Sequence, residues 1–329
     1  MTFKKNWETT DQRYAIAPQT IEKMVALAFP DEKLSSHEMI SGGCANINSK
    51  ITINGSETPY ILRVYLRDKD AAYREQNLAL LLKKILPIPE IYFIGNLDHH
   101  QFAITEFRTG ISLRDYLLDS NPSQMEQLMT EVGKILATIQ NIHFASSGFF
   151  GKDLYLQEPI TQTSYINYAK TCLDHSTVAE TLGQDVISKI KTVLRKYASL
   201  LPNETDNHLV HGDFDPANLL IAQLNGRWQI SGVLDWEFAF SGSFLQDMAN
   251  MLRYAHQMPL TYEAAFLSGL QKGNVTLPEN WRLRTHLLNL LALLDCLTRA
   301  RPLECPNQSK DIRELINHIL SGIAKENLF

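Results

Sequence analysis

The sequence predicts an α+β protein with two lobes, in which a small, mostly antiparallel β-sheet with one main helix precedes a larger, mainly helical part. The chain has 329 residues, a length that suits one large domain or two lobes. Short β-like runs and short helical patterns alternate up to about residue 110, and long helical patterns follow. We therefore expect one lobe over residues 1–107 and a second over residues 108–329.

The first lobe is expected to begin with a helix and a hairpin. Apolar residues recur at helical spacing from Ile21 to Ala28. Two β-like runs, residues 49–54 and 60–65, flank the dipeptide Asn54-Gly55, which is typical of a tight turn. These two runs are therefore interpreted as paired strands.

A second helix and two further strands complete the first lobe. Four apolar residues define one face of that helix: Leu78, Leu81, Leu82 and Ile85. Pro87 ends it, and strands are expected over residues 91–94 and 101–107. The second lobe shows long amphipathic patterns over residues 125–139 and 186–194, and one hairpin of residues 219–221 and 228–234.

Composition limits the kinds of partner. Hydrophobic residues make up 44% and charged residues 20% of the chain, as in ordinary globular proteins, and the net charge of -5 argues against nucleic-acid binding. The longest apolar run, residues 287–297, is too short to span a bilayer, and no apolar stretch follows the first basic residues. The four cysteines are scattered. We expect a soluble cytoplasmic protein that binds neither nucleic acid nor membranes; its oligomeric state is left open.

The residues that indicate chemistry lie around the second-lobe hairpin. An apolar strand leads into His211-Gly212-Asp213-Phe214-Asp215-Pro216-Ala217-Asn218, and the returning strand leads into Asp235-Trp236-Glu237. Pairing about a turn at Asn225-Gly226 places Asn218 opposite or diagonal to Asp235. Amide and carboxylate oxygens suit Mg²⁺ that also holds substrate phosphates.

Asp213 lies on the loop before this hairpin, where it could accept the proton of a hydroxyl nucleophile. Taken singly, these polar residues are more simply turn formers and caps. Their convergence at one end of a hairpin favours a site. Two interpretations of His211 remain open: a residue that supports the loop backbone through hydrogen bonds, and an ordinary buried histidine.

The pattern His-Gly-Asp-x-x-x-x-Asn followed by Asp-Trp-Glu resembles the aminoglycoside phosphotransferase family, small-molecule kinases with a bilobal protein-kinase-like fold. The resemblance implies ATP, or another nucleoside triphosphate, and Mg²⁺. It makes Asp213 the catalytic base and Asn218 and Asp235 the metal ligands. It also implies that Asp247 braces the catalytic loop, although Asp247 would equally pass as a surface helix residue.

Arg63 and Glu75 provide a separate indication in the first lobe. Each lies at an apolar position, Arg63 in the strand 60–65 and Glu75 on the helix stripe, so each needs a partner. In the resemblance they are the strand cation that touches the ATP phosphates and the glutamate that holds it. A purely structural ion pair is the alternative.

Two further segments resemble nucleotide-binding parts of the family. Gly42, Gly43 and Asn46 precede the first predicted strand and are similar to the loop that covers the nucleotide, although paired glycines are more often simple turns. Thr105 and Phe107 lie at the end of the last first-lobe strand, where the family's backbone pairs with adenine.

Two other functions compete with a small-molecule kinase. A protein kinase would need a long segment for its peptide substrate, but only eleven residues separate Asp235 from Asp247. A nucleotide-binding protein without catalysis is the second alternative. The acceptor is expected to be a small hydroxyl compound, with an aminoglycoside-like antibiotic as the leading guess and a choline-, homoserine- or macrolide-type alcohol as the alternative. Asp215 and Glu237 are weaker candidates for acceptor contacts.

Overall fold

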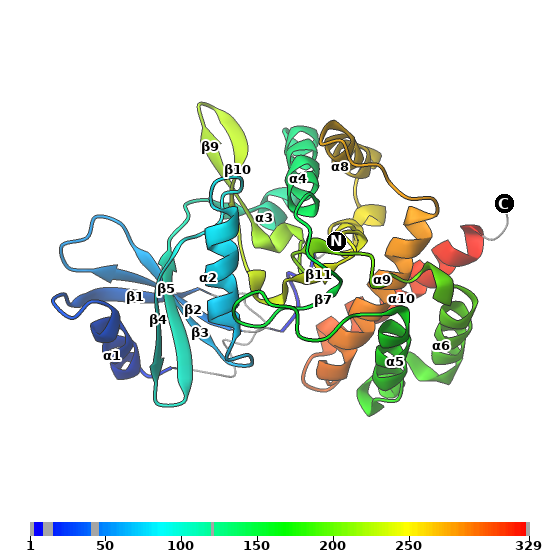
Figure 1. The fold of residues 1–329 in the computed structure, drawn as a ribbon, viewed down its shortest axis with the longest axis horizontal. Coiled ribbons are helices and arrows are strands. Elements are labelled where there is room, and N and C mark those ends of the chain that lie inside the picture. Colours follow the sequence, from blue (N-terminus) through cyan, green and yellow to red (C-terminus); the bar gives the residue numbers. More distant parts are fainter. Residues whose placement is uncertain (1–2, 9–15, 41–45, 120–121, 327–329) are drawn as a thin grey trace.

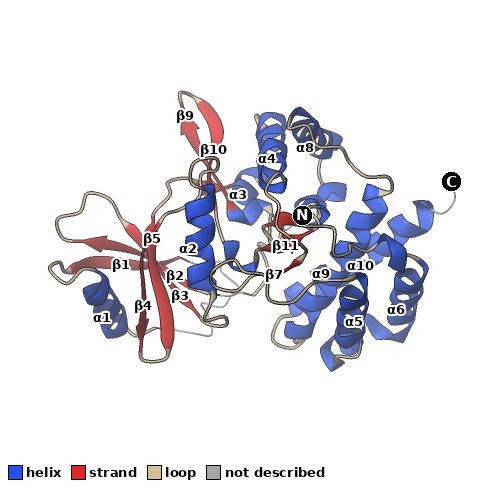
Figure 2. Cartoon of the chain, viewed as in Figure 1, coloured by secondary structure: helices blue, strands red, loops and turns tan. Residues whose placement is uncertain are grey.

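The computed structural model describes residues 3–8, 16–40, 46–119 and 122–326, and it has the predicted bilobal α+β architecture (Figure 1). A sheet-containing part lies on one side of the molecule, and most helices lie on the other (Figure 2). Loops that carry the predicted chemical residues run between these parts. The fold class predicted from the sequence is therefore confirmed.

The first part is built on a five-stranded antiparallel sheet with the order β1-β2-β3-β5-β4. Its strands are β1 (Leu34–Ile40), β2 (Ile47–Ile53), β3 (Tyr60–Tyr65), β4 (Ile91–Leu97) and β5 (His100–Glu106). The four predicted strands are present, and β3 has the predicted bounds. Strand β1 was not predicted, because after the half-buried Leu34 every residue in it is exposed and no alternation marks it.

Two helices pack on the opposite faces of this sheet, α1 (Pro18–Ala28) and α2 (Ala71–Leu82). In β3, Leu62 and Val64 join the apolar cluster beneath α1, whereas Tyr65 packs with the start of α2. This alternation turns Arg63 toward α2 as well. The predicted apolar face of α2 was partly wrong, because Leu81 and Ile85 are exposed and small alanines take their place in the contact.

The second part contains eight α-helices within the described residues: α3 (Leu113–Leu117), α4 (Met125–Gln140), α5 (Gln162–Leu173), α6 (Ser176–Lys196), α7 (Leu245–Leu252), α8 (Leu260–Lys272), α9 (Trp281–Arg299) and α10 (Pro306–Glu326). Helix α9 contacts α5, α6, α7 and α10, so it forms the centre of this part. Helices α4 and α8 approach closely at Gly133 and Gly269, where an added Cβ would meet backbone atoms at 2.2 and 2.1 Å.

Short strands position the chemical residues against these helices. One three-stranded sheet has the order β10-β9-β6, and the other has the order β7-β11-β8. Their members are β6 (Ile111–Ser112), β7 (Gly148–Phe149), β8 (His208–Val210), β9 (Leu219–Leu224), β10 (Arg227–Val233) and β11 (Phe240–Gly242). The loop from β8 to β9 and the end of β10 therefore meet.

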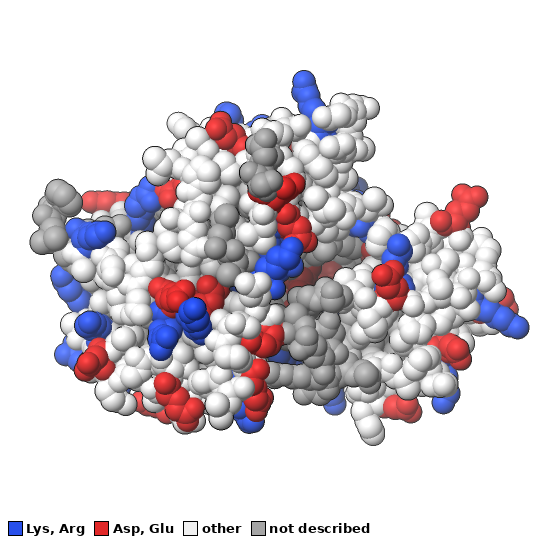
Figure 3. Space-filling model, turned by 180° about the vertical axis from the view of Figure 1, so that it is seen from behind, with Lys and Arg blue, Asp and Glu red and all other residues white. Residues whose placement is uncertain are grey.

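Residues 3–8 lie against the helical part, where Phe3 packs on Tyr254 and Tyr262. The lobe boundary at residue 107 stays a prediction. Across the described residues, no helix has the length and apolarity needed to cross a membrane. Basic and acidic side chains are interspersed on the face shown in Figure 3.

Candidate active site

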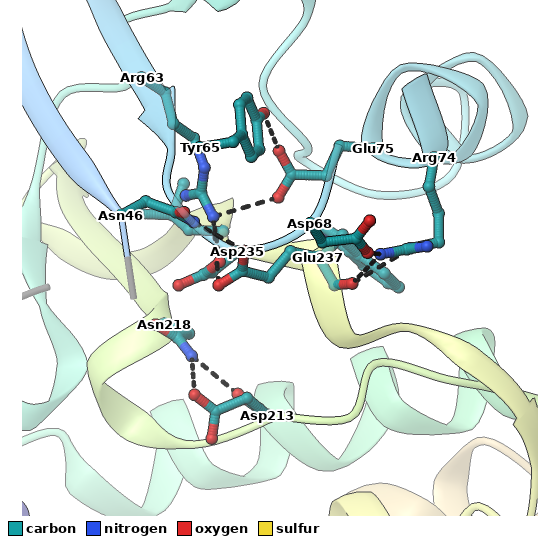
Figure 4. Close-up of polar contacts among 12 residues, drawn as sticks. Asn46, Arg63, Tyr65, Asp68, Arg74, Glu75, Asp213, Asn218, Asp235 and Glu237 are labelled. Carbon is teal, nitrogen blue, oxygen red and sulfur yellow. Dashed lines mark hydrogen bonds and ion pairs between the residues drawn. The ribbon is translucent and has the colours of Figure 1, made fainter. Parts of the chain in front are cut away.

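The loop after β8 is shaped by a glycine. Gly212 has φ +87°, and a Cβ there would lie 2.3 Å from the carbonyl oxygen of Phe238. Only glycine tolerates both the positive φ and this close approach. The turn presents the next residue, Asp213, beside Asn218 (Figure 4).

Helix α7 holds the backbone of this loop. The Asp247 carboxylate accepts the N–H groups of His211 at 2.8 Å and Gly212 at 3.0 Å. One helical turn on, the Asn250 amide donates to the Gly212 carbonyl at 2.9 Å. Burial raises the pKa of Asp247 to about 7, despite these two N–H bonds. Asp247 thus contacts the loop as a brace would, and it is fully buried rather than on the surface.

His211 combines the two interpretations left open by the sequence. Its ring is completely buried. One ring nitrogen, Nδ1, accepts the N–H of Asp213 at 3.2 Å, and Nε2 donates to the Leu234 carbonyl at 2.8 Å. Burial lowers the pKa of His211, so the neutral ring fits this arrangement. The histidine therefore links the loop to the end of β10.

The β9–β10 hairpin brings Asn218 and Asp235 to the same end. Leu219 pairs with Val233, and the N–H of Leu234 donates to the Asn218 carbonyl at 2.9 Å. Asp235 follows with φ +66°, an uncommon conformation for a residue with a side chain. The Asn218 amide also donates to the Asp213 carbonyl oxygen at 2.8 Å and to its carboxylate Oδ2 at 3.0 Å. The register predicted from the sequence is confirmed.

Arg63 joins the two parts of the molecule. Its Nη2 lies 2.5 Å from Asp235 Oδ1, 3.4 Å from Glu75 Oε1 and 3.7 Å from Glu237 Oε1. The predicted pairing of Arg63 with Glu75 is present, and Tyr65 adds a hydroxyl donor to Glu75 at 2.5 Å. Three carboxylates thus surround one guanidinium (Figure 4).

This cluster has the composition expected of a cation site. Glu237 Oε1 is buried without a hydrogen-bond partner, and burial together with Asp235 raises the pKa of Glu237 to about 8. Among the described residues, no three His, Cys, Asp or Glu side chains are arranged to hold a metal by themselves. Asn218 and Asp235 offer one amide oxygen and one carboxylate, and Mg²⁺ in proteins uses one or two protein oxygens and completes its shell with phosphates and water.

A model of the phosphotransferase enzyme family matches residues 37–284 of the chain. The chain belongs to this family. It is therefore a phosphotransferase of the kind that acts on hydroxyl groups of small molecules. A comparison with curated protein sequences gives no match.

Solved structures share the fold of this phosphotransferase at low sequence identity. A thermostable mutant of aminoglycoside phosphotransferase APH(4)-Ia, in ternary complex with AMP-PNP and hygromycin B, has a TM-score of 0.69 and 21% identity over 92% of this chain and 98% of that one. Spectinomycin phosphotransferase APH(9)-Ia, in complex with ADP and spectinomycin, has a TM-score of 0.62 and 12% identity over 93% and 99%. Choline kinase LicA from Streptococcus pneumoniae has a TM-score of 0.61 and 14% identity over 92% and 98%.

The other candidate nucleotide-binding residues of the phosphotransferase are placed as follows. Gly42 and Gly43 lie outside the described residues. Asn46 is buried and donates to Glu237 Oε2 at 2.7 Å. Thr105 is buried within β5, and Phe107 follows that strand with the Lys50 ammonium 4.8 Å from its ring centroid.

The two weaker acceptor candidates have different surroundings. Glu237 lies with Asn46 and Arg63, near the predicted nucleotide side. Asp215 is buried within the loop between β8 and β9; its Oδ1 accepts the N–H of Ala217 at 2.8 Å, and its Oδ2 pairs with Lys4. The Glu237 side chain therefore contacts Asn46 and Arg63, whereas Asp213 and Asp215 contact Lys4.

Some residues of the site were missed by sequence analysis. Lys4 contacts Asp213 and Asp215, but nothing in a lysine near the start of a chain points there. Arg74 reaches across to the Glu237 carbonyl oxygen at 2.7 Å. Asn250 was the most accessible to prediction, because it lies three residues after Asp247 on the same helical face.

Proposed function

We propose that this phosphotransferase moves the γ-phosphoryl group of ATP, or of another nucleoside triphosphate, to a hydroxyl of a small molecule, with Asp213 as the catalytic base. The observation that carries the proposal is the meeting of Asp213, Asn218 and Asp235 at the end of one hairpin. The bound AMP-PNP and ADP named for APH(4)-Ia and APH(9)-Ia support a nucleotide as the donor.

Each residue has a defined part in the proposed reaction. Asp213 accepts the proton of the acceptor hydroxyl as that oxygen forms a bond to the γ-phosphorus, and the bond from phosphorus to the β,γ-bridging oxygen breaks to release ADP. Asn218 and Asp235 are the residues that would hold Mg²⁺, which supplies charge neutralisation for the phosphate oxygens. Arg63, held by Glu75, is placed to meet phosphate charge once Asp235 turns to the metal.

The residues before and after position 107 divide this work in the proposal. The five-stranded sheet contributes Arg63 and the segment around Asn46, whereas the helical part contributes Asp213, Asn218 and Asp235. The nucleotide is therefore proposed to lie between them, with the adenine near the backbone of residues 105–107.

The acceptor is proposed to be a cationic alcohol of the aminoglycoside type. Asp213 and Asp215 already hold one ammonium group, that of Lys4, so the base lies in surroundings that accept a cation. A choline-, homoserine- or macrolide-type alcohol is the alternative, supported for choline by the fold shared with LicA. Five acidic residues of the helical part are exposed and fit a solvated face rather than an acceptor pocket: Asp153, Glu158, Asp174, Glu180 and Asp185.

A panel of hydroxylated compounds tests this function. ADP release is measured with Mg²⁺ and ATP for aminoglycosides, spectinomycin, choline, homoserine and macrolides. We expect one class to raise ADP release well above the rate without acceptor, with the phosphate recovered on the compound. Stoichiometric phosphorylation of a protein, with no turnover on any small alcohol, would contradict the proposal. Nucleotide binding without any transfer would favour the non-catalytic alternative.

A further inference from the structure

The first described segment of the chain is fixed across the helical part. Phe3 is buried, with its ring centroid 5.2 Å from that of Tyr254. Trp7 is also buried, and its indole N–H donates to Asp311 of α10 at 2.8 Å. Glu8 accepts the N–H groups at the beginning of α10 at 3.0 and 3.2 Å. Residues 3–8 are therefore held at both ends. Lys4 lies between these anchors.

Lys4 reaches from this segment to the proposed base. Its ammonium lies 3.0 Å from Asp213 Oδ1 and also pairs with Asp215 Oδ2, while its side chain is only 16% exposed. Burial alone would lower the pKa of Lys4, but the two carboxylates outweigh it and raise the pKa above its ordinary value. The cation thus stays charged where it is.

Both carboxylate oxygens of Asp213 are consequently engaged. Oδ2 accepts from Asn218, and Oδ1 accepts from Lys4. The Asn218 amide is fixed by a second bond, to the backbone carbonyl of Asp213. Asn218 belongs to the same loop as Asp213, whereas Lys4 reaches Asp213 from another part of the chain through a flexible side chain. The Lys4 bond is therefore the one that a local movement can release. An acceptor hydroxyl that donates to Oδ1 from the side of Lys4 would take the place of the ammonium.

We propose that residues 3–8 are an intramolecular occupant of the acceptor subsite, with the Lys4 ammonium in the position of the acceptor's reacting end. This inference rests on the proposed function, because it takes Asp213 as the base. The segment then acts as a competitive restraint that an acceptor displaces. The apparent affinity for the acceptor is the intrinsic affinity multiplied by the fraction of molecules whose subsite is open.

The test compares full-length Lys4→Met with Lys5→Met. Lys5 is the matched control, because it belongs to the same segment but pairs with Asp115 at the surface, with side chains 53% and 42% exposed. The measured reaction is hydrolysis of ATP with Mg²⁺ and no added acceptor, so that water is the probe. If the wild-type subsite is open about a tenth of the time, Lys4→Met raises hydrolysis about tenfold, and Lys5→Met leaves it unchanged.

Hydrogen exchange reports the position of the segment without any reaction. The Trp7 amide, which donates to the Lys4 carbonyl at 3.1 Å, is expected to be protected in the wild type and in Lys5→Met, and to exchange faster in Lys4→Met, with the rest of the chain unchanged. Exchange of the wild-type Trp7 amide at the rate of a free peptide would overturn the proposal. So would hydrolysis that falls or stays constant in Lys4→Met.

A third variant separates the two proposals. If Asp213→Asn abolishes ATP hydrolysis while Lys4→Met does not raise it, this inference fails and the proposed function stands. If Asp213→Asn leaves hydrolysis unchanged, the assignment of Asp213 as the base is wrong. The proposal that residues 3–8 occupy the acceptor subsite then fails as well, because it depends on that assignment.

Discussion

The Asp213 carboxylate is held by the Asn218 side-chain amide on one oxygen and by the Lys4 ammonium on the other. Burial alone would raise the pKa of Asp213, but Lys4 outweighs this effect and lowers it. The ionised form that a base requires is therefore the form that the structure stabilises.

Replacement of Asp213 by asparagine tests the base directly. The amide has the same shape but cannot take up the proton of an acceptor hydroxyl. We expect kcat for phosphoryl transfer to fall about 10²- to 10⁴-fold, while the Kd for ATP changes little. Single-turnover transfer and calorimetric ATP binding measure the two quantities. A variant with near wild-type kcat would remove Asp213 from the mechanism.

Gly212 offers a second test at this scale, with Gly226 as its control. Both have positive φ, +87° and +76°, but only at Gly212 does an added Cβ meet a neighbour, the Phe238 carbonyl oxygen. We expect Gly226→Ala to lower the free energy of unfolding by about 1 kcal/mol through backbone strain. Gly212→Ala should cost about 2 kcal/mol or more and should also reduce turnover. Equal losses of unfolding free energy in the two variants would mean that the backbone relieves the contact between the new Cβ and the Phe238 carbonyl oxygen at little cost.

Sequence reasoning located the residues whose positions depend on local geometry. Asn218 and Asp235 follow from counting along a hairpin, and that count requires no knowledge of the rest of the fold. Lys4 depends on where the chain returns over the helical part, which no periodicity encodes. Glu237 was a weaker candidate for acceptor contacts; its carboxylate accepts from the Asn46 amide, and its role stays a prediction.

At the scale of elements, strand β3 carries Arg63 and helix α2 carries Glu75, and these two side chains pair with each other. The pattern of β3 gave its bounds correctly because its buried residues run almost continuously. The predicted face of α2 was partly wrong: Leu78 and Leu82 are buried, but Leu81 and Ile85 are exposed, and Ala71, Ala72 and Ala79 make the close contact. Helical spacing defines a face but not the distance at which it packs.

A double-mutant cycle measures the coupling between these two elements. Arg63 and Glu75 side chains are 11% and 10% exposed, so each is costly to leave alone. We expect Arg63→Met and Glu75→Gln to show a coupling of about 1 to 3 kcal/mol in urea unfolding. The exposed pair Lys83 and Glu90 is the control, with an expected coupling below about 0.5 kcal/mol. Strictly additive losses for Arg63 and Glu75 would contradict the pairing.

For the whole molecule, polar contacts join the sheet-containing part to the segment of residues 235–237 at several points. Arg63 reaches Asp235, Asn46 reaches the Glu237 side chain, and Arg74 reaches the Glu237 backbone. The two contacts with Glu237 are buried and the contact with Asp235 is partly buried, so they form with limited competition from solvent. The relative placement of the two parts therefore depends on the same charges that are proposed to bind nucleotide.

Stability of the whole chain is expected to depend on pH through Asp247, which lies in the centre of the helical part. Burial raises its pKa to about 7 in the folded protein, against an ordinary value of about 4 for an aspartate. Between these values the unfolded chain has released the proton and the folded chain has kept it. Stability is thus fully present below about pH 4 and is lost as the pH rises through about 7.

Comparison with Asp247→Asn isolates this contribution, because the amide does not titrate. The urea unfolding free energy of each protein is measured at pH 5 and at pH 8. We expect the wild type to lose about 2 to 3 kcal/mol more than the variant over this range. Other titrating groups are common to both proteins and cancel in the difference. The same pH dependence in both would show that Asp247 is already ionised at pH 5, held so by the N–H groups of His211 and Gly212.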